Sequence, residues 1–176
     1  MNLLKRARHG VSGSGGFTLI ELAVAAVIMV LIGLVVTKFM ITTSEAFTLD
    51  SNTATLKQQS ERAIDTMAER IHKAQMGSFV LSNGNSTIDF VDGADGSLVQ
   101  YTLTPLAPVA PVWGEITQTI TDTLGVTRTT AIAGYVQNLQ FALSGTGRVT
   151  INATFNMGTG RTQTTLAVQA EALARN

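Results

Sequence analysis

The chain has 176 residues, of which 12 are basic and 12 are acidic, and it contains no cysteine. The lack of cysteine excludes a disulfide framework and a thiolate metal site. Hydrophobic residues make up 45% of the chain and charged residues only 14%, which predicts one domain plus an apolar anchor instead of a single soluble domain.

The first 16 residues form a basic segment that ends in glycine and serine residues. Its only charged residues are Lys5, Arg6 and Arg8. Without this segment the chain has 9 basic and 12 acidic residues, a net charge of −3. The mildly acidic balance argues against a broad nucleic-acid surface.

The order of the N-terminal segments differs from that of a secretory signal. In such a signal the small residues of the cleavage site follow the apolar stretch, whereas Gly15 and Gly16 precede it here. Cleavage between Gly16 and Phe17 would remove the basic segment and keep the apolar one. The basic segment is expected to stay in the cytoplasm and the bulk of the chain to be translocated. The alternative is an uncleaved signal anchor.

Residues 17–41 are long enough to cross a membrane as a helix, at about 1.5 Å per residue against a hydrocarbon core of about 30 Å. Glu21 and Lys38 are the only charged residues of this stretch. Lys38 lies near its far end, where the side chain can reach the interface. Glu21 lies near its beginning, and an ionisable group inside a membrane costs roughly 3 kcal/mol and marks function.

Residues 42–76 contain neither proline nor glycine, so the helix is predicted to continue beyond the membrane. Apolar or small residues recur there at steps of three, four and seven, which places them on one helix face. They are Leu49, Leu56, Ser60, Ala63, Ile64, Met67, Ile71 and Ala74. Gly77 is the expected stop, with His72 and Lys73 in the last turn, so one helix is expected from about residue 18 to about residue 76.

After Gly77 the pattern changes to short strands separated by turns. Turns are predicted at 83–85, 92–96, 122–125, 145–147 and 158–160. Residues 112–132 are expected to form a hairpin or an irregular excursion after Pro105, Pro108 and Pro111, because proline lacks the N–H that a ladder needs. The predicted fold class is α+β, an antiparallel meander covered by the apolar helix face between Ala63 and Ala74.

The sequence Gly-Phe-Thr-Leu-Ile-Glu-Leu at residues 16–22 resembles the processing and methylation signature of type IV prepilins, a family that includes the pseudopilins of type II secretion. The resemblance implies cleavage between Gly16 and Phe17 by a prepilin peptidase, followed by N-methylation of Phe17. It also implies a pilin-like lollipop with four parts: a removed leader (1–16), a transmembrane helix (17–41), its amphipathic continuation (42–76) and a β-rich head (77–176).

Looser similarities link residues 60–75, 135–141 and the final Arg175-Asn176 to J-type pseudopilins and W-type minor pilins. The chain is therefore predicted to be a structural minor pilin or pseudopilin of a type IV pilus or a type II secretion pseudopilus, not an enzyme, without a cofactor. Implied partners are other subunits, the peptidase, a cytoplasmic ATPase and an inner-membrane platform protein. The implied location is the bacterial inner membrane, with the head periplasmic or extracellular, and then the filament.

Three alternatives stay open. The first is a ligand-binding pilin that captures DNA or a surface. The second is a major pilin, and the third is an uncleaved membrane-anchored enzyme or sensor. Exposed clustered arginines would favour the first, and Arg128, Arg148 and Arg161 are its candidates. The lack of cysteine argues against a major pilin with a disulfide-closed C-terminal region.

Glu21 is the predicted assembly residue. After cleavage Phe17 carries a new α-amino group, and the carboxylate of Glu21 has two candidate partners: a cation on a neighbouring subunit, or its own Phe17 amine one turn away. Attraction is stronger in low dielectric than in water, and an unpaired buried carboxylate is strongly unfavourable. The resemblance favours the contact between subunits.

Other reactive residues have ordinary structural interpretations. His9 lies in the leader, and His72 is interpreted as a capping or interface residue. Asp89, Asp92 and Asp95 lack the ligand count of a calcium loop. The two Gly-Thr-Gly sequences are interpreted as turns, because no Lys-Ser/Thr pair follows them at a helix start. Trp113 is expected in the core of the head, the alternative being contact with a partner.

Overall fold

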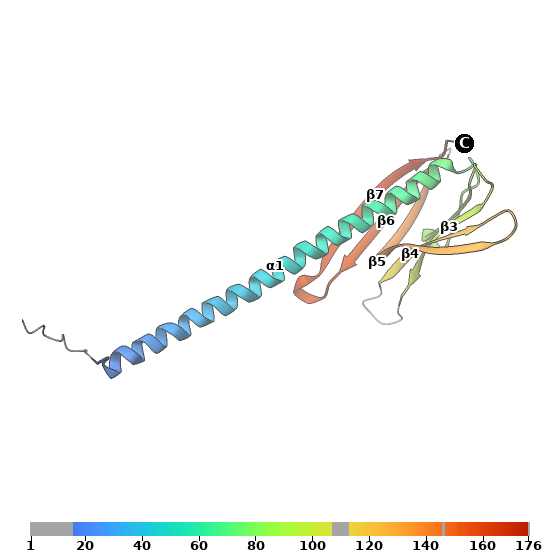
Figure 1. The fold of residues 1–176 in the computed structure, drawn as a ribbon. Coiled ribbons are helices and arrows are strands. Elements are labelled where there is room, and N and C mark those ends of the chain that lie inside the picture. Colours follow the sequence, from blue (N-terminus) through green and yellow to red (C-terminus); the bar gives the residue numbers. More distant parts are fainter. Residues whose placement is uncertain (1–15, 107–112, 146, 176) are drawn as a thin grey trace, which may run out of the picture. The chain divides into compact units, whose positions relative to one another are not determined.

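The computed structural model describes residues 16–106, 113–145 and 147–175. The predicted leader up to residue 15, with His9, and the prolines 108 and 111 lie outside these residues. The chain divides into two compact units, Met1–Thr43 and Ser44–Asn176. A single 55-residue helix, α1 (Leu19–Lys73), contributes to both units (Figure 1).

The first unit consists of the start of α1. Thr37 and Thr42 direct their hydroxyls back to the carbonyls of Gly33 and Lys38 at 2.8 and 3.0 Å. These bonds satisfy the polar groups of the threonines within the helix, as an apolar environment requires. By length and composition α1 can cross a membrane.

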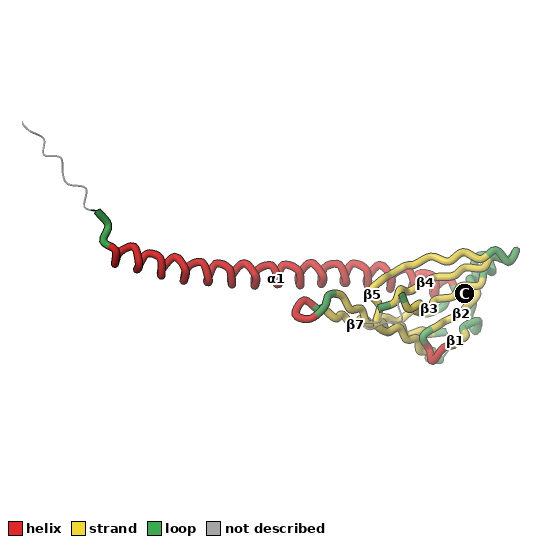
Figure 2. The backbone as a smooth tube through the Cα atoms, turned by 90° about the horizontal axis from the view of Figure 1, so that it is seen from below, coloured by secondary structure: helices red, strands yellow, loops and turns green. Residues whose placement is uncertain are grey.

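The second unit is an α+β domain in which the remainder of α1 packs on a seven-stranded antiparallel sheet (Figure 2). The strands follow one another in chain order, so the predicted meander is confirmed. They are β1 (Val80–Ser82), β2 (Thr87–Val91), β3 (Leu98–Pro105), β4 (Gly114–Thr121), β5 (Thr127–Ser144), β6 (Arg148–Met157) and β7 (Thr164–Leu173). Short 3₁₀ turns, η1 (Asn83–Asn85) and η2 (Gly160–Thr162), join β1 to β2 and β6 to β7.

The core of the second unit lies between α1 and the sheet. The helix contributes one buried face, which matches the predicted stripe: Leu56, Ser60, Ala63, Ile64, Met67 and Ile71. The largest fully buried side chains of the sheet are aromatic: Tyr101, Phe90, Phe141 and Phe155. The prediction that this helix face covers the sheet is confirmed.

The helix ends at Lys73, three residues before the predicted end at residue 76. Ala74 forms an isolated β-bridge with Asp92, and the N–H of Gln75 donates to the carbonyl of Val91 at 2.8 Å. The backbone groups after Lys73 are thus bonded to the sheet instead of continuing the helix. Gly77, the predicted stop, has φ +80° and belongs to the turn that leads into β1.

Strand β5 also differs from the prediction, which ended a hairpin or irregular excursion at residue 132. It is a single strand of 18 residues whose first part pairs with β4 and whose second part pairs with β6. Its register shifts where Tyr135 has φ 59°, a conformation that bulky side chains rarely adopt. This bulge bends the strand, so that one segment serves both halves of the sheet.

The end of α1 is held on the sheet by charge and by main-chain bonds. The guanidinium of Arg70 lies 2.7 Å from the Oδ2 of Asp92, whose side chain is only 1% exposed. Gly93 donates its N–H to the carbonyl of Lys73 at 2.8 Å. Arg175 donates its N–H to the carbonyl of His72 at 3.2 Å. The last helical turn therefore contacts both the β2–β3 turn and the C-terminal segment.

We predict that Asp92→Ala lowers the free energy of unfolding of the second unit by about 2 kcal/mol, because the buried carboxylate accepts bonds from Arg70 at 2.7 Å and from the N–H of Ala94 at 2.9 Å that the variant loses. Urea unfolding of the full chain in detergent, followed by Trp113 fluorescence, measures this. The control is Glu171→Ala, which breaks the exposed Arg148–Glu171 pair and is expected to cost less than about 0.5 kcal/mol. Equal losses in both variants would contradict the structural role of Asp92.

Burial raises the pKa of Tyr101 above its ordinary value of 10.0, although the Nε2 of Gln118 donates to its hydroxyl at 2.8 Å. An acid whose pKa is raised by folding stabilises the fold below its unfolded pKa and loses that contribution as the pH rises further. In a Tyr135→Phe background, where Tyr101 is the remaining tyrosine, tyrosinate absorbance should appear only together with unfolding, well above pH 10. Reversible ionisation near pH 10 in the folded protein would contradict this.

Candidate functional site

The candidate site at the start of α1 is built around Thr18 and Glu21. The backbone N–H of Thr18 donates to the Oε2 of Glu21 at 2.9 Å, and the Thr18 hydroxyl donates to the same oxygen at 3.1 Å. In return, the N–H of Glu21 donates to the Thr18 hydroxyl at 3.3 Å. This reciprocal arrangement is a capping box, which satisfies donors that the first turn of a helix leaves free.

Only charged partners were predicted for Glu21, and Thr18 was not among them. The signal was present, since a threonine followed three residues later by glutamate before an apolar run predicts a capping box. In the uncleaved chain Glu21 is bonded to Thr18; the α-amino group of Phe17, its alternative predicted partner, exists only after cleavage. Gly16 and Phe17 precede the helix, and the Phe17 side chain is 86% exposed. The predicted cleavage site is thus an accessible segment directly before the first helical turn.

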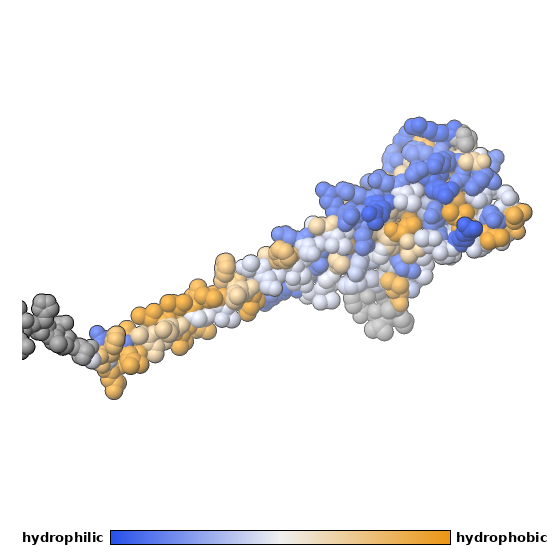
Figure 3. All heavy atoms as spheres, in the orientation of Figure 1, coloured by the Kyte–Doolittle hydropathy of each residue, from blue (hydrophilic) through white to orange (hydrophobic). Residues whose placement is uncertain are grey.

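The surface that follows the capping box is apolar all around the helix. Large hydrophobic side chains from Leu19 to Ile41 are exposed, from 49% at Val36 to 90% at Leu19. Figure 3 shows these side chains along the first part of α1. The first unit contains no other described element that could cover them. Such a large exposed apolar surface requires lipid or another protein around it.

The three candidate arginines of the second unit lie on different parts of the sheet. Arg148 pairs in register with Leu173 at one end of the β6–β7 hairpin, and Arg161 lies in η2 at the other end. A ten-residue strand separates these ends by about 30 Å. Arg128 lies on β5 opposite Ile120. The three arginines therefore form no common patch.

The predicted acidic candidates have structural partners. Asp92 pairs with Arg70, and Asp89 accepts a bond from Gln100 at 2.7 Å. Hydrogen bonds from the Ser97 hydroxyl and N–H lower the pKa of Asp95. Within the described ranges no group of three or more acidic or histidine side chains is placed to hold a metal ion.

His72 and Trp113 lie at the margin of the packed domain. The Nδ1 of His72 is 2.6 Å from the carbonyl of Leu173, a contact consistent with the predicted capping or interface role. Trp113 is half-buried and packs edge-on against Tyr135, with ring centroids 5.8 Å apart. It was expected in the core but lies beside it. Its Nε1 is buried and has no hydrogen-bond partner.

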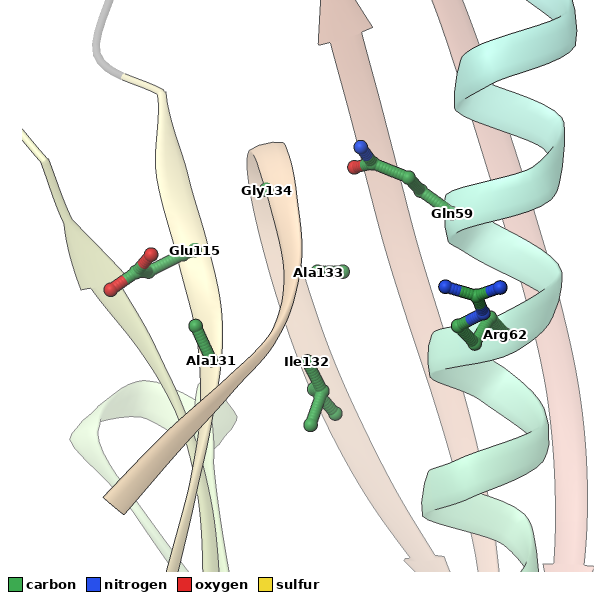
Figure 4. A pocket seen from close by; sticks show the side chains of 7 residues that line it. All are labelled: Gln59, Arg62, Glu115, Ala131, Ile132, Ala133 and Gly134. Atoms are coloured by element: carbon green, nitrogen blue, oxygen red, sulfur yellow. The ribbon is translucent and has the colours of Figure 1, made fainter.

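A shallow hollow of about 240 Å³ lies between α1 and β5. In Figure 4 Gln59 and Arg62 extend from the helix toward the strand, whereas the carboxylate of Glu115 points away from them. The Oε1 of Gln59 is buried without a hydrogen-bond partner. The hollow thus offers one free acceptor and one guanidinium, a set suited to holding a polar group and not to nucleophilic chemistry.

The fold and the N-terminal motif define a class of protein: a long apolar N-terminal helix followed by an antiparallel sheet. A scan against protein-family models found no matching family, and searches of curated proteins and of solved structures found no matching protein.

We predict that Thr18→Ala accelerates amide exchange at Glu21 several-fold, because the variant removes the hydroxyl that accepts this N–H. Exchange measured on the full chain in detergent tests this. Thr37→Ala is the matched control, since the Thr37 hydroxyl bonds a carbonyl within the helix and its loss should leave the first turn unchanged. Unaltered exchange at Glu21 in the Thr18 variant would show that the capping box does not hold the helix start.

Proposed function

We propose that this chain is a structural subunit of the type IV pilin and pseudopilin class, which acts by assembly through its N-terminal helix and has no catalytic turnover. The proposal rests on two properties of α1: its exposed apolar surface and its continuation into the folded domain. One continuous helix presents an uncovered apolar surface with a single carboxylate in its first turn, and its later residues form one side of a folded domain. In a soluble protein the apolar surface of the first part of α1 would face water, whereas a filament packed through helices buries it.

The proposed maturation begins with residues 1–16 in the cytoplasm and residues 17–41 in the inner membrane. A prepilin peptidase cleaves between Gly16 and Phe17, and the new Phe17 amine is methylated. The exposed, non-helical segment before Leu19 supports this step, because a protease needs an accessible backbone. Residues 42–76 and the head, 77–176, then lie on the periplasmic or extracellular side.

The proposed role of Glu21 follows from its two oxygens. Oε2 accepts both bonds from Thr18, which partly offsets the cost of placing a carboxylate in lipid. Oε1 is left to accept from a cation of a neighbouring subunit. In low dielectric this attraction is strong, and it forms only when adjacent helices are in register. The carboxylate thus favours correct stacking of subunits.

Within the class, we favour a minor pilin of the W type or a pseudopilin of the J type. The looser similarities at residues 60–75 and 135–141 and the absence of cysteine support this assignment. The proposed partners are other pilin or pseudopilin subunits, the peptidase, the cytoplasmic ATPase and the inner-membrane platform protein. The separation of Arg128, Arg148 and Arg161 gives no support to a DNA-capturing head.

The direct test of maturation is the N-terminus of the protein isolated from its native host. Mass spectrometry of the first peptide should find N-methylated Phe17 as residue one. A Gly16→Leu variant, which obstructs the cleavage site without changing the helix, should keep the basic leader. An intact leader on the wild-type protein would overturn the proposal.

The test of assembly uses two substitutions at Glu21. Glu21→Gln keeps an oxygen that can complete the capping box but removes the charge, whereas Glu21→Ala removes both. We expect both variants to insert and to be cleaved normally, and both to enter sheared filaments at least tenfold less than wild type, because the cation then has no carboxylate to meet. Normal incorporation of Glu21→Gln would show that the charge is not required.

A further inference from the structure

Strand β7 forms one outer edge of the sheet, since among the described residues it pairs with β6 alone. Folded proteins blunt such edges with very short strands, lysine, proline or bulges. The opposite edge, β1, is three residues long. Strand β7 has ten residues, contains neither lysine nor proline, and pairs with β6 without a register shift. None of these devices applies to β7. A covering helix is another such device, but the hydrogen bonds from α1 reach this edge only near its two ends, at Thr162 and at Leu173.

The register shows which backbone groups of β7 point outward. Ala174 donates its N–H to the carbonyl of Gly147 at 3.0 Å, and in an antiparallel ladder bonded and non-bonded pairs alternate. Even-numbered residues of β7 therefore bond to β6, and odd-numbered residues direct N–H and C=O away from it. The outward set is Thr165, Ala167, Gln169 and Glu171.

The contacts at the C-terminal end of the same edge confirm that the odd-numbered residues direct their backbone groups outward. The carbonyl of Leu173 and the N–H of Arg175 belong to the outward series, and both are bonded to His72 of α1. The helix therefore closes the edge at Leu173. Between Thr165 and Glu171 the described residues provide no partner for the outward backbone groups. An extended chain has the matching spacing of donors and acceptors, at about 6.8 Å for every second residue.

The side chains of β7 also determine which side chains an added strand would need. Its inner face carries Leu166, Val168 and Ala170, which pack against the core but are only half-buried. An added strand with an apolar residue at every second position would cover their exposed sides. On the outer face, Glu171 lies 3.3 Å from Arg148 and is 57% exposed. A basic residue on the added strand opposite Glu171 would complete a row of alternating charge.

The directions of α1 and β7 decide against a second copy paired through its own β7. The Nδ2 of Asn52 donates to the carbonyl of Thr162 at 3.1 Å, and His72 contacts Leu173, so the helix runs along β7 in the same direction as the strand. A two-fold pairing of β7 strands is antiparallel. It would place the two Ser44 ends at opposite ends of the pair, which does not allow both chains to enter one membrane. This step rests on the proposed anchor.

We propose that the β7 edge between Thr165 and Glu171 is a binding site for an extended segment of another polypeptide, which adds an eighth strand to the sheet. The segment has about seven residues, alternates apolar and polar side chains, and carries a basic residue opposite Glu171. Main-chain bonds supply its affinity, and the half-buried inner row with Glu171 supplies its specificity.

The test uses the absence of cysteine in the chain. Gln169→Cys in the full-length protein is labelled with a benzophenone maleimide in membranes of the native host and irradiated, and adducts are mapped by mass spectrometry. We expect an adduct within an alternating apolar and polar segment of another protein. The reference is Thr129→Cys, which is equally placed on an exposed strand face. No adduct above this reference, or an adduct with β7 of a second copy, would overturn the proposal.

The backbone contribution is tested by Ala167→Pro in the labelled background. This change removes an outward N–H, so it spares the ladder with β6, and it should lower the adduct yield at least tenfold. Ala167→Val keeps the N–H and should change the yield less than twofold. Thr165→Pro, at the beginning of the strand, is the second variant if Ala167→Pro destabilises the fold in urea. Unchanged yield with a proline variant would refute strand addition, whether or not the N-terminus is processed.

Discussion

The structure depends on one constraint: the first part of α1 has an apolar surface that its own unit leaves uncovered. Side chains from Leu19 to Ile41 are exposed on every side of the helix, and transferring such a surface out of water is strongly favourable. In the proposed function the apolar environment is lipid first and neighbouring helices later. Glu21 and Lys38 are the charged exceptions in this stretch, and the Thr18 capping box supplies hydrogen bonds to the carboxylate of Glu21.

The later part of the same helix has a different role, because it packs on the sheet. Its buried face, from Leu56 to Ile71, covers an antiparallel sheet for which the described part of the chain provides no second layer. The Arg70–Asp92 pair and the bonds of His72 hold the last turn on the sheet. One helix thus carries an exposed apolar surface in the first unit and a buried face in the second. The two proposals use different surfaces: the apolar stretch of the first unit for assembly, and the β7 edge of the second unit for an added strand.

The features set by local pattern were predictable from the sequence. The 3.6-residue repeat indicated the buried helix face, and the glycine-rich turns indicated the meander. Features set by tertiary contact were not. The helix ends at Lys73 because Ala74 bridges Asp92, directly after β2, and Gln75 donates to Val91. Strand β5 is continuous because Tyr135 adopts φ 59°, which its residue type does not suggest. The turn predicted at 158–160 indicated a final strand but not its place at the edge of the sheet. The capping box also follows from local pattern, since Thr18 and Glu21 have its spacing, but it was not predicted.

The central claim is that the first part of α1 lies in an apolar medium supplied from outside the chain. Spin labels at Val30→Cys and, as reference, Thr129→Cys test it most directly, because the chain has no other cysteine. In membranes of the native host, the label at residue 30 should collide readily with oxygen and hardly at all with a water-soluble nickel chelate, whereas the label at residue 129 should show the reverse. Equal access of the nickel chelate to both labels would place residue 30 in water and contradict the account.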